Sequence, residues 1–475
     1  MIWKTAWKNV WRNKGRSLVV IASVTVGIFA GVFSIALMNG MIAQRIDDAI
    51  NDEISHIQIN SKNFRINNDP QLVIGNSERV LSVIRSVDGV SGISERTIIT
   101  GMANTASKSA GVQIIGIDPD MEKKVFTLYS KVMPGTGNYF EKDSKLNLAL
   151  IGQELAKDLN ILRYSVDSAT LTRLREKGLS GKLISKLVPI LEKKFANEKQ
   201  FIKEMKSLFS KAEEMKYGLL IRKEAWSFRE GARMTLTFLD KDNNQVGAVF
   251  RLTGLYDIVN SMFEKNSVFV RNSDIKKLTG VAENDYQQFV IRINNVDQTD
   301  EIADKLSQKL PDLEVMSWKK IQPDLAMMTD MVSQFYLIFG IIILAALAFG
   351  IINTMLMVVI ERTRELGMLT AIGMNKKKVF SMIMLESVFL SLIGAVTGMI
   401  ISYILIRITG NTGINLAQAA EGFEAIGYSS IVYPKISAGF FGIVTILIII
   451  TGILSSIYPA MKALKLNPVE AIRAE

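Results

Sequence analysis

Few residues of this chain have the types and spacing that catalysis or metal binding requires. His56 is the single histidine among 475 residues and cysteine is absent, so thiol catalysis and a histidine- or cysteine-based metal site are excluded. Residues 180–182 read Ser-Gly-Lys, but Glu176 and Leu183 break the pattern G-x-x-x-x-G-K-[ST] that surrounds a phosphate with backbone amides. No nucleophile elbow, zinc motif or dinucleotide fingerprint occurs either. We therefore expect a structural His56 and no enzyme activity in this chain.

One charged stretch has the composition of a contact surface. Residues 361–379, ERTRELGMLTAIGMNKKKV, lie between two long apolar runs; they are too charged for the bilayer and too short for a domain. Arg362, Arg364 and Glu365 supply charged hydrogen-bonding groups, and Gly367 and Gly373 permit close approach of a partner. Leu366, Met368 and Leu369 could supply an apolar anchor. We expect a helix that a separate protein contacts. The alternative is a membrane-surface turn whose basic side chains extend toward the headgroups.

Four long uncharged runs flank this stretch and the central part of the chain: Ser17–Gln44, Met331–Ile360, Ser387–Ile406 and Ile436–Met461. Each holds the roughly 20 residues that cross a hydrocarbon core of about 30 Å as a helix. A helix is required because lipid cannot pair free backbone groups. The first run is longer than a signal-peptide core and no A-x-A site follows it, so we expect an uncleaved anchor.

Basic residues near these runs predict the orientation in the membrane. Before the first run lie Lys4, Lys8, Arg12, Lys14 and Arg16. After the second run lie Arg362, Arg364 and Lys376–Lys378. After the fourth run lie Lys462, Lys465 and Arg473. Both termini and residues 361–378 are therefore expected in the cytoplasm, and residues 46–330 outside. Trp3, Trp7 and Trp11 share one helical face, with Arg12 among the basic residues beside them, which predicts an amphipathic helix on the lipids of the inner leaflet.

Residues 46–330 alternate between strand and helix patterns. Strands are expected at Ser55–Asn60, Gly111–Ile117, Met234–Leu239, Val246–Leu255, Ser267–Val270, Gln288–Ile293 and Leu313–Met316, and helices at Glu78–Val87 and Thr299–Leu310. This mixture predicts a large α+β domain in two lobes. Residues 163–229 contain 16 basic and 8 acidic residues on helical patterns. We interpret them as an inserted, solvated helical hairpin; a docking surface for an acidic partner or for lipid headgroups is the alternative.

Polar and small residues inside the apolar runs indicate helix contacts. Asn353 lies in the cytoplasmic half of the second run, where a polar side chain more often joins helices than binds a substrate. Glu386 is a functional candidate because carboxylates are costly in a membrane. The alternatives are pairing with nearby basic residues and exposure to interfacial water. Gly394 and Gly398 form a G-x-x-x-G face that suits close helix packing.

Several of these segments resemble the FtsX/MacB-like family of ABC permeases. The likeness lies in the charged stretch, the chain start AWKNVWRNKGRS and the tail Tyr458–Arg473. In the charged stretch the motif residues are Arg364, Glu365, Leu366, Gly367, Ala371, Ile372 and Gly373. In the tail they are Pro459, Ala460, Pro468, Glu470, Ala471 and Arg473. Residues 116–119 and 150–156 are similar to segments of the family's exported domain.

The resemblance implies a domain organisation and partners. Residues 1–45 would hold the amphipathic helix and first span, 46–330 the extracytoplasmic domain, and 331–475 three further spans with a coupling helix at 361–378. The exported domain would comprise a Porter-like lobe (46–118 and 284–325) and a Sabre-like lobe (119–283) that contains the insertion 163–229. Two permease subunits, identical or different, would bind an ABC ATPase dimer that holds ATP and Mg. No cofactor is expected in this chain, and no nucleic-acid partner.

The resemblance also implies a function. ATPase closure would be transmitted to the exported domains, a mechanism called mechanotransmission, in a bacterial cytoplasmic (inner) membrane with the domain in the periplasm or outside the cell. The coupling residues would be Arg362, Arg364, Glu365, Leu366, Gly367, Ala371 and Gly373. We favour lipoprotein release or export of amphipathic substrates, as in LolC/LolE-type systems, with a lipoprotein or periplasmic carrier as a further partner. Alternatives are MacB-like efflux, control of cell-wall hydrolases, a membrane-anchored receptor and a membrane-bound enzyme.

Overall fold

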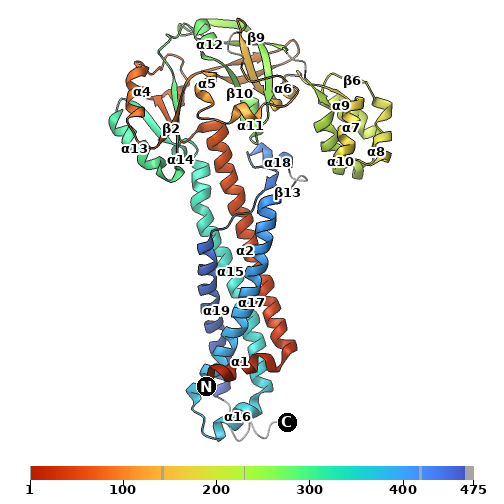
Figure 1. Cartoon of the computed structure of the whole chain (residues 1–475), viewed down its shortest axis with the longest axis vertical. Coiled ribbons are helices and arrows are strands. Elements are labelled where there is room, and N and C mark those ends of the chain that lie inside the picture. The colour runs from red at the N-terminus through yellow and green to blue at the C-terminus, as the bar shows by residue number, and fades with distance from the viewer. Residues whose placement is uncertain (1, 141–143, 229–230, 417–419, 466–475) are drawn as a thin grey trace. The chain divides into compact units, whose positions relative to one another are not determined.

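The structure, a computed structural model, describes the chain except for residues 1, 141–143, 229–230, 417–419 and 466–475. It divides into two compact units (Figure 1). The helical unit comprises Met1–Arg45, Asp324–Ala420 and Ser429–Glu475; the sheet unit comprises Ile46–Pro323 and Glu421–Tyr428. Each unit has apolar clusters of its own.

The described part of the helical unit contains four long helices: α2 (Lys14–Asp48), α15 (Pro323–Glu361), α17 (Lys376–Thr412) and α19 (Ala438–Leu464). The first three contain the first three predicted apolar runs, and α19 contains the fourth except for residues 436 and 437. Each is long and apolar enough to cross a membrane. The predicted arrangement of one span followed by three is therefore confirmed. With 39 residues, α15 is about 58 Å long at 1.5 Å per residue, so it exceeds the thickness of a hydrocarbon core.

Small residues let α17 lie directly against α2. A Cβ atom added at Gly394 would lie 2.7 Å from the Val24 Cβ, and one added at Gly398 would lie 2.7 Å from the Thr25 carbonyl oxygen. The Thr25 hydroxyl donates to the Gly394 carbonyl over 3.1 Å. Both glycines thus face α2, in the close packing that their spacing favours.

Shorter elements complete the helical unit. α1 (Ile2–Arg12) precedes α2, and α16 (Thr363–Ala371) connects α15 to α17. β13 (Ile414–Asn415) pairs antiparallel with β14 (Ile431–Val432). α18 (Ala420–Ala425) lies between these strands in sequence, but all of it after Ala420 belongs to the sheet unit. α1 packs on α17 through Ala6 and Val10, which are fully buried.

A nine-stranded sheet organises the described part of the sheet unit, in the order β12-β1-β11-β2-β3-β10-β4-β9-β8. The strands are β1 (Ile57–Ser61), β2 (Val90–Asn104), β3 (Ser109–Ile117), β4 (Leu148–Gly152), β8 (Arg233–Leu239), β9 (Gln245–Tyr256), β10 (Ser267–Arg271), β11 (Gln288–Ile293) and β12 (Leu313–Ser317). Neighbours run antiparallel except β3–β10 and β4–β9, which are parallel.

The long strand β2 belongs to both halves of this sheet. Its residues Val90–Arg96 pair with β11, and Thr97–Asn104 pair with β3. Gly101–Asn104 also pair with β8, so the second half closes on itself through β2-β3-β10-β4-β9-β8. The lobe boundary at residue 118 stays a prediction; the hydrogen-bonding partner of β2 changes near Thr97.

Short helices cover the two halves. α4 (Ser77–Arg85) and α13 (Thr299–Lys309) supply apolar side chains to the core of the first half, and α6 (Gln153–Asp158), α11 (Ser261–Asn266) and α12 (Asn272–Thr279) pack on the second. Single turns occur at α3 (Phe64–Asn67), α5 (Pro119–Glu122) and α14 (Trp318–Ile321). The α+β prediction is confirmed, and each predicted strand and helix lies within two residues of an observed one.

The insertion folds as a compact module, here the insertion module (residues 163–228). It contains β5 (Arg163–Ser165), α7 (Ser168–Glu176), α8 (Gly181–Ser185), β6 (Lys194–Phe195), α9 (Glu198–Leu208), α10 (Lys211–Ala225) and β7 (Trp226–Ser227), with sheet order β6-β5-β7. Tyr164 and Phe201 stack in its core with ring centroids 5.4 Å apart. The predicted hairpin is therefore wrong in detail, because a three-stranded sheet joins the helices.

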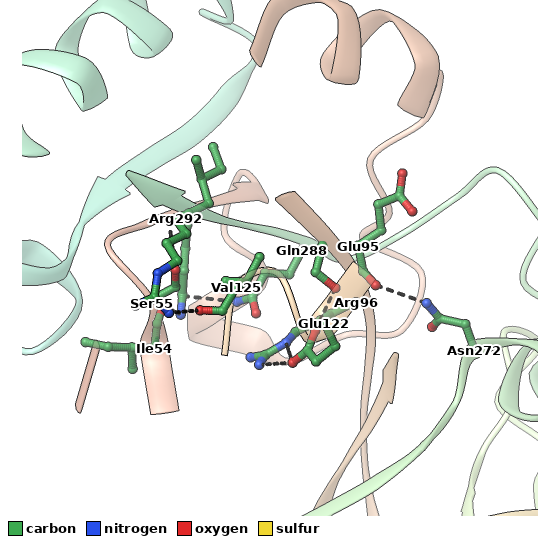
Figure 2. Close-up of polar contacts among 12 residues, drawn as sticks. Ile54, Ser55, Glu95, Arg96, Glu122, Val125, Asn272, Gln288 and Arg292 are labelled. Carbon is green, nitrogen blue, oxygen red and sulfur yellow. Dashed lines mark hydrogen bonds and ion pairs between the residues drawn. The ribbon is translucent and has the colours of Figure 1, made fainter. Parts of the chain in front are cut away.

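The backbone that leads from α2 into β1 has an unusual conformation. Ala49–Ile54 form a π-helical turn, and the Ser55 N–H donates to the Ile50 carbonyl over 3.1 Å. Ser55 then adopts φ 62° and ψ −175°, a region that in practice only glycine occupies without strain. Its hydroxyl donates to the Ile291 carbonyl of β11 over 2.8 Å (Figure 2). The surrounding hydrogen bonds therefore hold this strained residue in place.

Candidate functional site

The charged stretch folds as α16, and one face of this helix points into the protein. Leu366 is 4% exposed and belongs to the same apolar cluster as Val359 of α15 and Val379 of α17; Gly367 is also buried. Leu366 thus packs within the protein, because a short helix at the end of two long ones needs its own apolar contact to stay in place. A role for Leu366 at a partner interface stays a prediction.

The opposite face of α16 is exposed. Arg364, Met368 and Ile372 recur at intervals of four residues, and the last two are 51% and 79% exposed. Ala371 and Gly373 are exposed beside them, and the φ of 94° at Gly373 permits the turn toward α17. The Arg364 side chain makes no hydrogen bond or ion pair with the residues that the structure describes. We name Arg364, Met368, Ala371, Ile372 and Gly373 the coupling face.

A chain of charges ties the helix to its neighbours on the inner side. Arg362 donates from Nε to Glu365 over 3.1 Å and from NH1 to both carboxylate oxygens of Glu386 over 3.1 and 3.3 Å. Arg12 donates to the other oxygen of Glu365. We name Arg12, Arg362, Glu365 and Glu386 the ion network; it connects α1, α16 and α17.

Burial increases along the ion network from one end to the other. The side chains of Arg12 and Glu365 are 54% and 44% exposed, whereas those of Arg362 and Glu386 are 16% and 6% exposed. Partial burial raises the pKa of Glu365, but hydrogen bonds from Arg12 and Arg362 outweigh it and hold that pKa below its ordinary value. Glu386 is paired with Arg362, as the alternative interpretation of its charge predicted.

The ion network borders a polar cavity of about 230 Å³. Asn9, Asn13 and Ser17 also line it, and the buried Asn9 Nδ2 has no hydrogen-bond partner among the described residues. Sequence reasoning missed these three residues. Their recurrence at intervals of four residues was the available signal, and the neighbouring tryptophan pattern obscured it. Such a cavity gives the charges of the network room to rearrange without entering an apolar core.

The three tryptophans of α1 have a contact within the protein in addition to any with lipid. The rings of Trp3 and Trp7 meet the ring of Phe389 of α17 edge-on, with centroids 4.8 and 5.4 Å apart, and Trp11 meets Trp7 at 6.2 Å. All three remain between 44% and 62% exposed. Their contact with membrane lipids stays a prediction, and Arg12 has an additional role through Glu365.

Other predicted residues lie apart from this site. Asn353 is exposed and bonds to no helix among the described residues, while its neighbour Thr354 donates to Gly350 of its own helix over 2.9 Å. Pro468, Glu470, Ala471 and Arg473 of the tail lie outside the described residues. Among the described residues, no group of three or more histidine, aspartate or glutamate side chains is arranged to hold a metal ion.

The fold and the site together define a multi-pass membrane protein with a large α+β domain and a short helix held between two spans. Residues 337–468 match the family model FtsX-like permease C-terminal, and residues 17–168 match the MacB-like periplasmic core domain. Over these two segments the chain therefore resembles FtsX/MacB-like ABC transporter permeases, and its large domain is periplasmic or extracellular.

Individual relatives agree with this assignment. The uncharacterized ABC transporter permease MJ1507 of Methanocaldococcus jannaschii is 25% identical over 48% of this chain and 55% of its own length. The macrolide export ATP-binding/permease protein MacB of Chlorobium luteolum is 35% identical over 26% of this chain and 16% of its own. The chain thus spans about half the length, or less, of these relatives. The extracellular domain of YknZ from Gram-positive bacteria is 12% identical in sequence, and the match covers 55% of this chain and 99% of that domain. The two superpose with a TM-score of 0.30, which is too low to support a detailed comparison.

Proposed function

We propose that this protein is the permease subunit of an ABC transporter and relays ATP hydrolysis by a separate ATPase to its extracytoplasmic domain. The observation that carries the proposal is the division of α16 into two faces. The coupling face presents an unpaired cation, Arg364, with the exposed apolar side chains Met368 and Ile372. The inner face is tied by the ion network to α1 and α17.

The relay follows from where these bonds lie. A partner that binds the coupling face moves α16, and the Arg362–Glu386 and Arg12–Glu365 pairs carry that movement to α17 and α1. The Arg362–Glu386 pair is the stiffer of the two, because its side chains are only 16% and 6% exposed and separating charges at a low-dielectric site is costly. The half-exposed Arg12–Glu365 pair can exchange partners more easily. ATP and Mg would be held by the ATPase dimer, and a second permease subunit would complete the assembly.

Charge reversal at the coupling face tests the proposal. Full-length protein with an affinity tag is captured from native membranes, and the ATP hydrolysis of the captured material is measured. Arg364→Glu should lose the ATPase from the captured complex, because its side chain is available only to a partner. Lys376→Glu, a change of equal charge at an exposed lysine at the start of α17, is the matched control and should retain it. Retention of normal hydrolysis in Arg364→Glu would overturn the proposal.

We propose an amphipathic substrate, with lipoprotein release as the favoured case. An apolar cavity of about 410 Å³ lies among α2, α15 and α19, lined for example by Gly31, Ile341 and Val444, and its walls are almost wholly apolar. Its size and lining suit a hydrocarbon chain. If lipoproteins are the substrate, depletion of the protein leaves them in the inner membrane, and unchanged lipoprotein sorting would eliminate this case.

Efflux of small molecules is the second candidate, favoured by the 35% identity with a protein named for macrolide export. The same apolar cavity would then hold a drug-sized molecule. Macrolide susceptibility of a deletion strain separates the two: increased susceptibility with normal lipoprotein sorting favours efflux.

A further inference from the structure

A second polar cavity, of about 500 Å³, lies in the sheet unit where β1 begins. Its polar lining comes from several segments: Asp47 at the end of α2, Asn51 in the π-helical turn, His56 before β1, Ser91 in β2, Lys124 after α5, and Arg292 and Asn294 at the end of β11. The relay proposed above uses none of these side chains, so the cavity needs an explanation of its own.

His56 indicates that the cavity holds a ligand. Its side chain is 4% exposed, and the buried Nδ1 has no hydrogen-bond partner among the described residues. Burial, with the nearby charge of Arg292, lowers the pKa of His56 to about 4, so the ring is neutral at neutral pH. A neutral imidazole carries its single proton on either nitrogen and donates from Nδ1 in one of the two forms. Because buried polar atoms are nearly always paired, an unpaired one on a residue that lines a polar cavity points to a group bound there.

Arg292 is held in position to bind an anion. Its NH1 donates to the Val125 carbonyl over 2.8 Å (Figure 2). Its NH2 donates to the Asn51 side-chain oxygen over 2.9 Å. A guanidinium has five N–H donors, so these two bonds orient the group and leave others for a ligand. Lys124 adds a second, exposed cation to the lining, against the single carboxylate of Asp47.

We propose that this cavity binds a phosphate-type oxyanion, with Arg292, Lys124 and His56 as its principal donors. Donors reach the cavity from segments on different sides, which suits a tetrahedral group better than a planar carboxylate. The phosphate belongs to a soluble anion or to a phospholipid headgroup; Asp47 and Asn51 lie on the helical segment that continues from the first membrane span. A bound anion would connect the π-helical turn, β11 and the segment after α5.

The single histidine makes the cavity directly observable. Full-length protein labelled with ¹⁵N-histidine and purified in dodecyl maltoside, with an affinity tag free of histidine, gives only the imidazole signals of His56. Inorganic phosphate added to a phosphate-free buffer should shift them saturably. Lys124→Gln should weaken the response roughly tenfold or more, since one charge-assisted hydrogen bond is lost.

The matched control is Lys123→Gln, an exposed neighbour whose ammonium lies 5.2 Å from the centre of the Tyr139 ring and not in the cavity lining. It should respond to phosphate like the unaltered protein. Asp47→Asn removes the one negative charge of the lining and should bind phosphate more tightly. Equal responses in Lys124→Gln and Lys123→Gln, or weaker binding in Asp47→Asn, would overturn the proposal.

A second preparation separates the two sources of phosphate. In phosphatidylglycerol nanodiscs without added phosphate, a headgroup in the cavity shifts the His56 signals relative to detergent, and Lys124→Gln removes that shift. A response to soluble phosphate alone identifies a free anion instead. Signals that change in neither preparation would show that the cavity binds no phosphate. No ATPase is needed, so this outcome is independent of the proposed relay.

Discussion

The helical unit and the sheet unit each hold a carboxylate with an arginine, but the two pairs differ in what surrounds them. In the sheet unit, the side chains of Arg96 and Glu122 form an ion pair and are 3% and 1% exposed (Figure 2). Ser94 donates to the same carboxylate over 2.6 Å, and Arg96 lies 4.1 Å from the centre of the Phe126 ring. In the helical unit, the Arg362–Glu386 pair borders a polar cavity and continues to the half-exposed Glu365 and Arg12.

These surroundings indicate that the Arg96–Glu122 pair stabilises the fold, whereas the Arg362–Glu386 pair can change its partners. Arg96 and Glu122 have their partners within a sealed site, so any displacement leaves a buried charge unpaired. The ion network has an exposed end and space beside it, so its members can exchange partners at lower cost. We infer that the first pair maintains the junction between the sheet halves and that the second is suited to transmitting movement.

The largest expected effect is on coupling. Glu386→Gln removes a charge from the inner end of the ion network but leaves the coupling face intact. The captured complex should therefore keep its ATPase. The stimulation of its ATP hydrolysis by substrate should fall roughly tenfold or more. Arg364→Gln at the coupling face should instead reduce the amount of ATPase captured. The comparison fails if both variants lose the ATPase to the same extent.

Breaking the sealed pair should cost the most stability. Arg96→Met leaves Glu122 buried and unpaired, which should destabilise the sheet unit by about 3–5 kcal/mol. Lower Tm and faster hydrogen exchange in β2 and α5 of the full-length protein measure the effect. The surface pair Arg79–Asp312, with both side chains 52% exposed, supplies the control: Arg79→Met should cost less than about 1 kcal/mol. Similar losses in the two variants would contradict a sealed site.

Protonation of His56 should destabilise the sheet unit in acid. Its pKa is about 4 in the folded protein and about 6.5 when unfolded, so the unfolded state takes up the proton first as pH falls. Stability should therefore be full above pH 6.5 and decline toward pH 4, by up to about 3 kcal/mol. Hydrogen exchange of β1 and β11 at several pH values in phosphate-free buffer measures this decline. His56→Asn should flatten it; an unchanged slope would show that other groups are responsible.

The smallest effect is expected from removing the insertion module. Arg163 pairs with Ser227 across β5 and β7, so the chain enters and leaves the module at adjacent positions and a short glycine–serine linker can close the gap. Deleting residues 164–226 should leave membrane insertion and ATPase capture unchanged, because the coupling face and the ion network lie in the helical unit. Loss of either would show that the module contributes to the stability of the rest of the protein.

Much of the fold could be predicted because its elements have strong local patterns. The four spans are long continuous apolar runs and strands such as β11 bury nearly all of their residues, so their predicted ends were nearly correct. β2 was missed because Gly92, Glu95, Arg96 and Gly101 interrupt its apolar pattern. These residues are there for contacts made by distant segments: Arg96 meets Glu122, and Gly101 lies against the Thr237 carbonyl of β8.

The candidate site was located by sequence, but its two faces were not. Charge and glycine content identified residues 361–379, whereas the inward direction of Leu366 depends on the apolar cluster that α15 and α17 build around it. The pairing of Glu365 with Arg12 could not be predicted from spacing either, because Arg12 lies 353 positions earlier in the chain. Spacing along one helix predicts which residues share a face, and only the packing of other helices decides where that face points.

Ser55 makes the connection between α2 and β1 dependent on one side-chain hydrogen bond. The conformation of this residue costs backbone energy, of order 1–3 kcal/mol for a residue in such a region, and the bond from its hydroxyl to the Ile291 carbonyl helps to hold it there. Ser55→Gly would remove both the strain and the bond, whereas Ser55→Ala would remove the bond alone. The backbone strain and the contact with β11 are therefore two parts of one local balance.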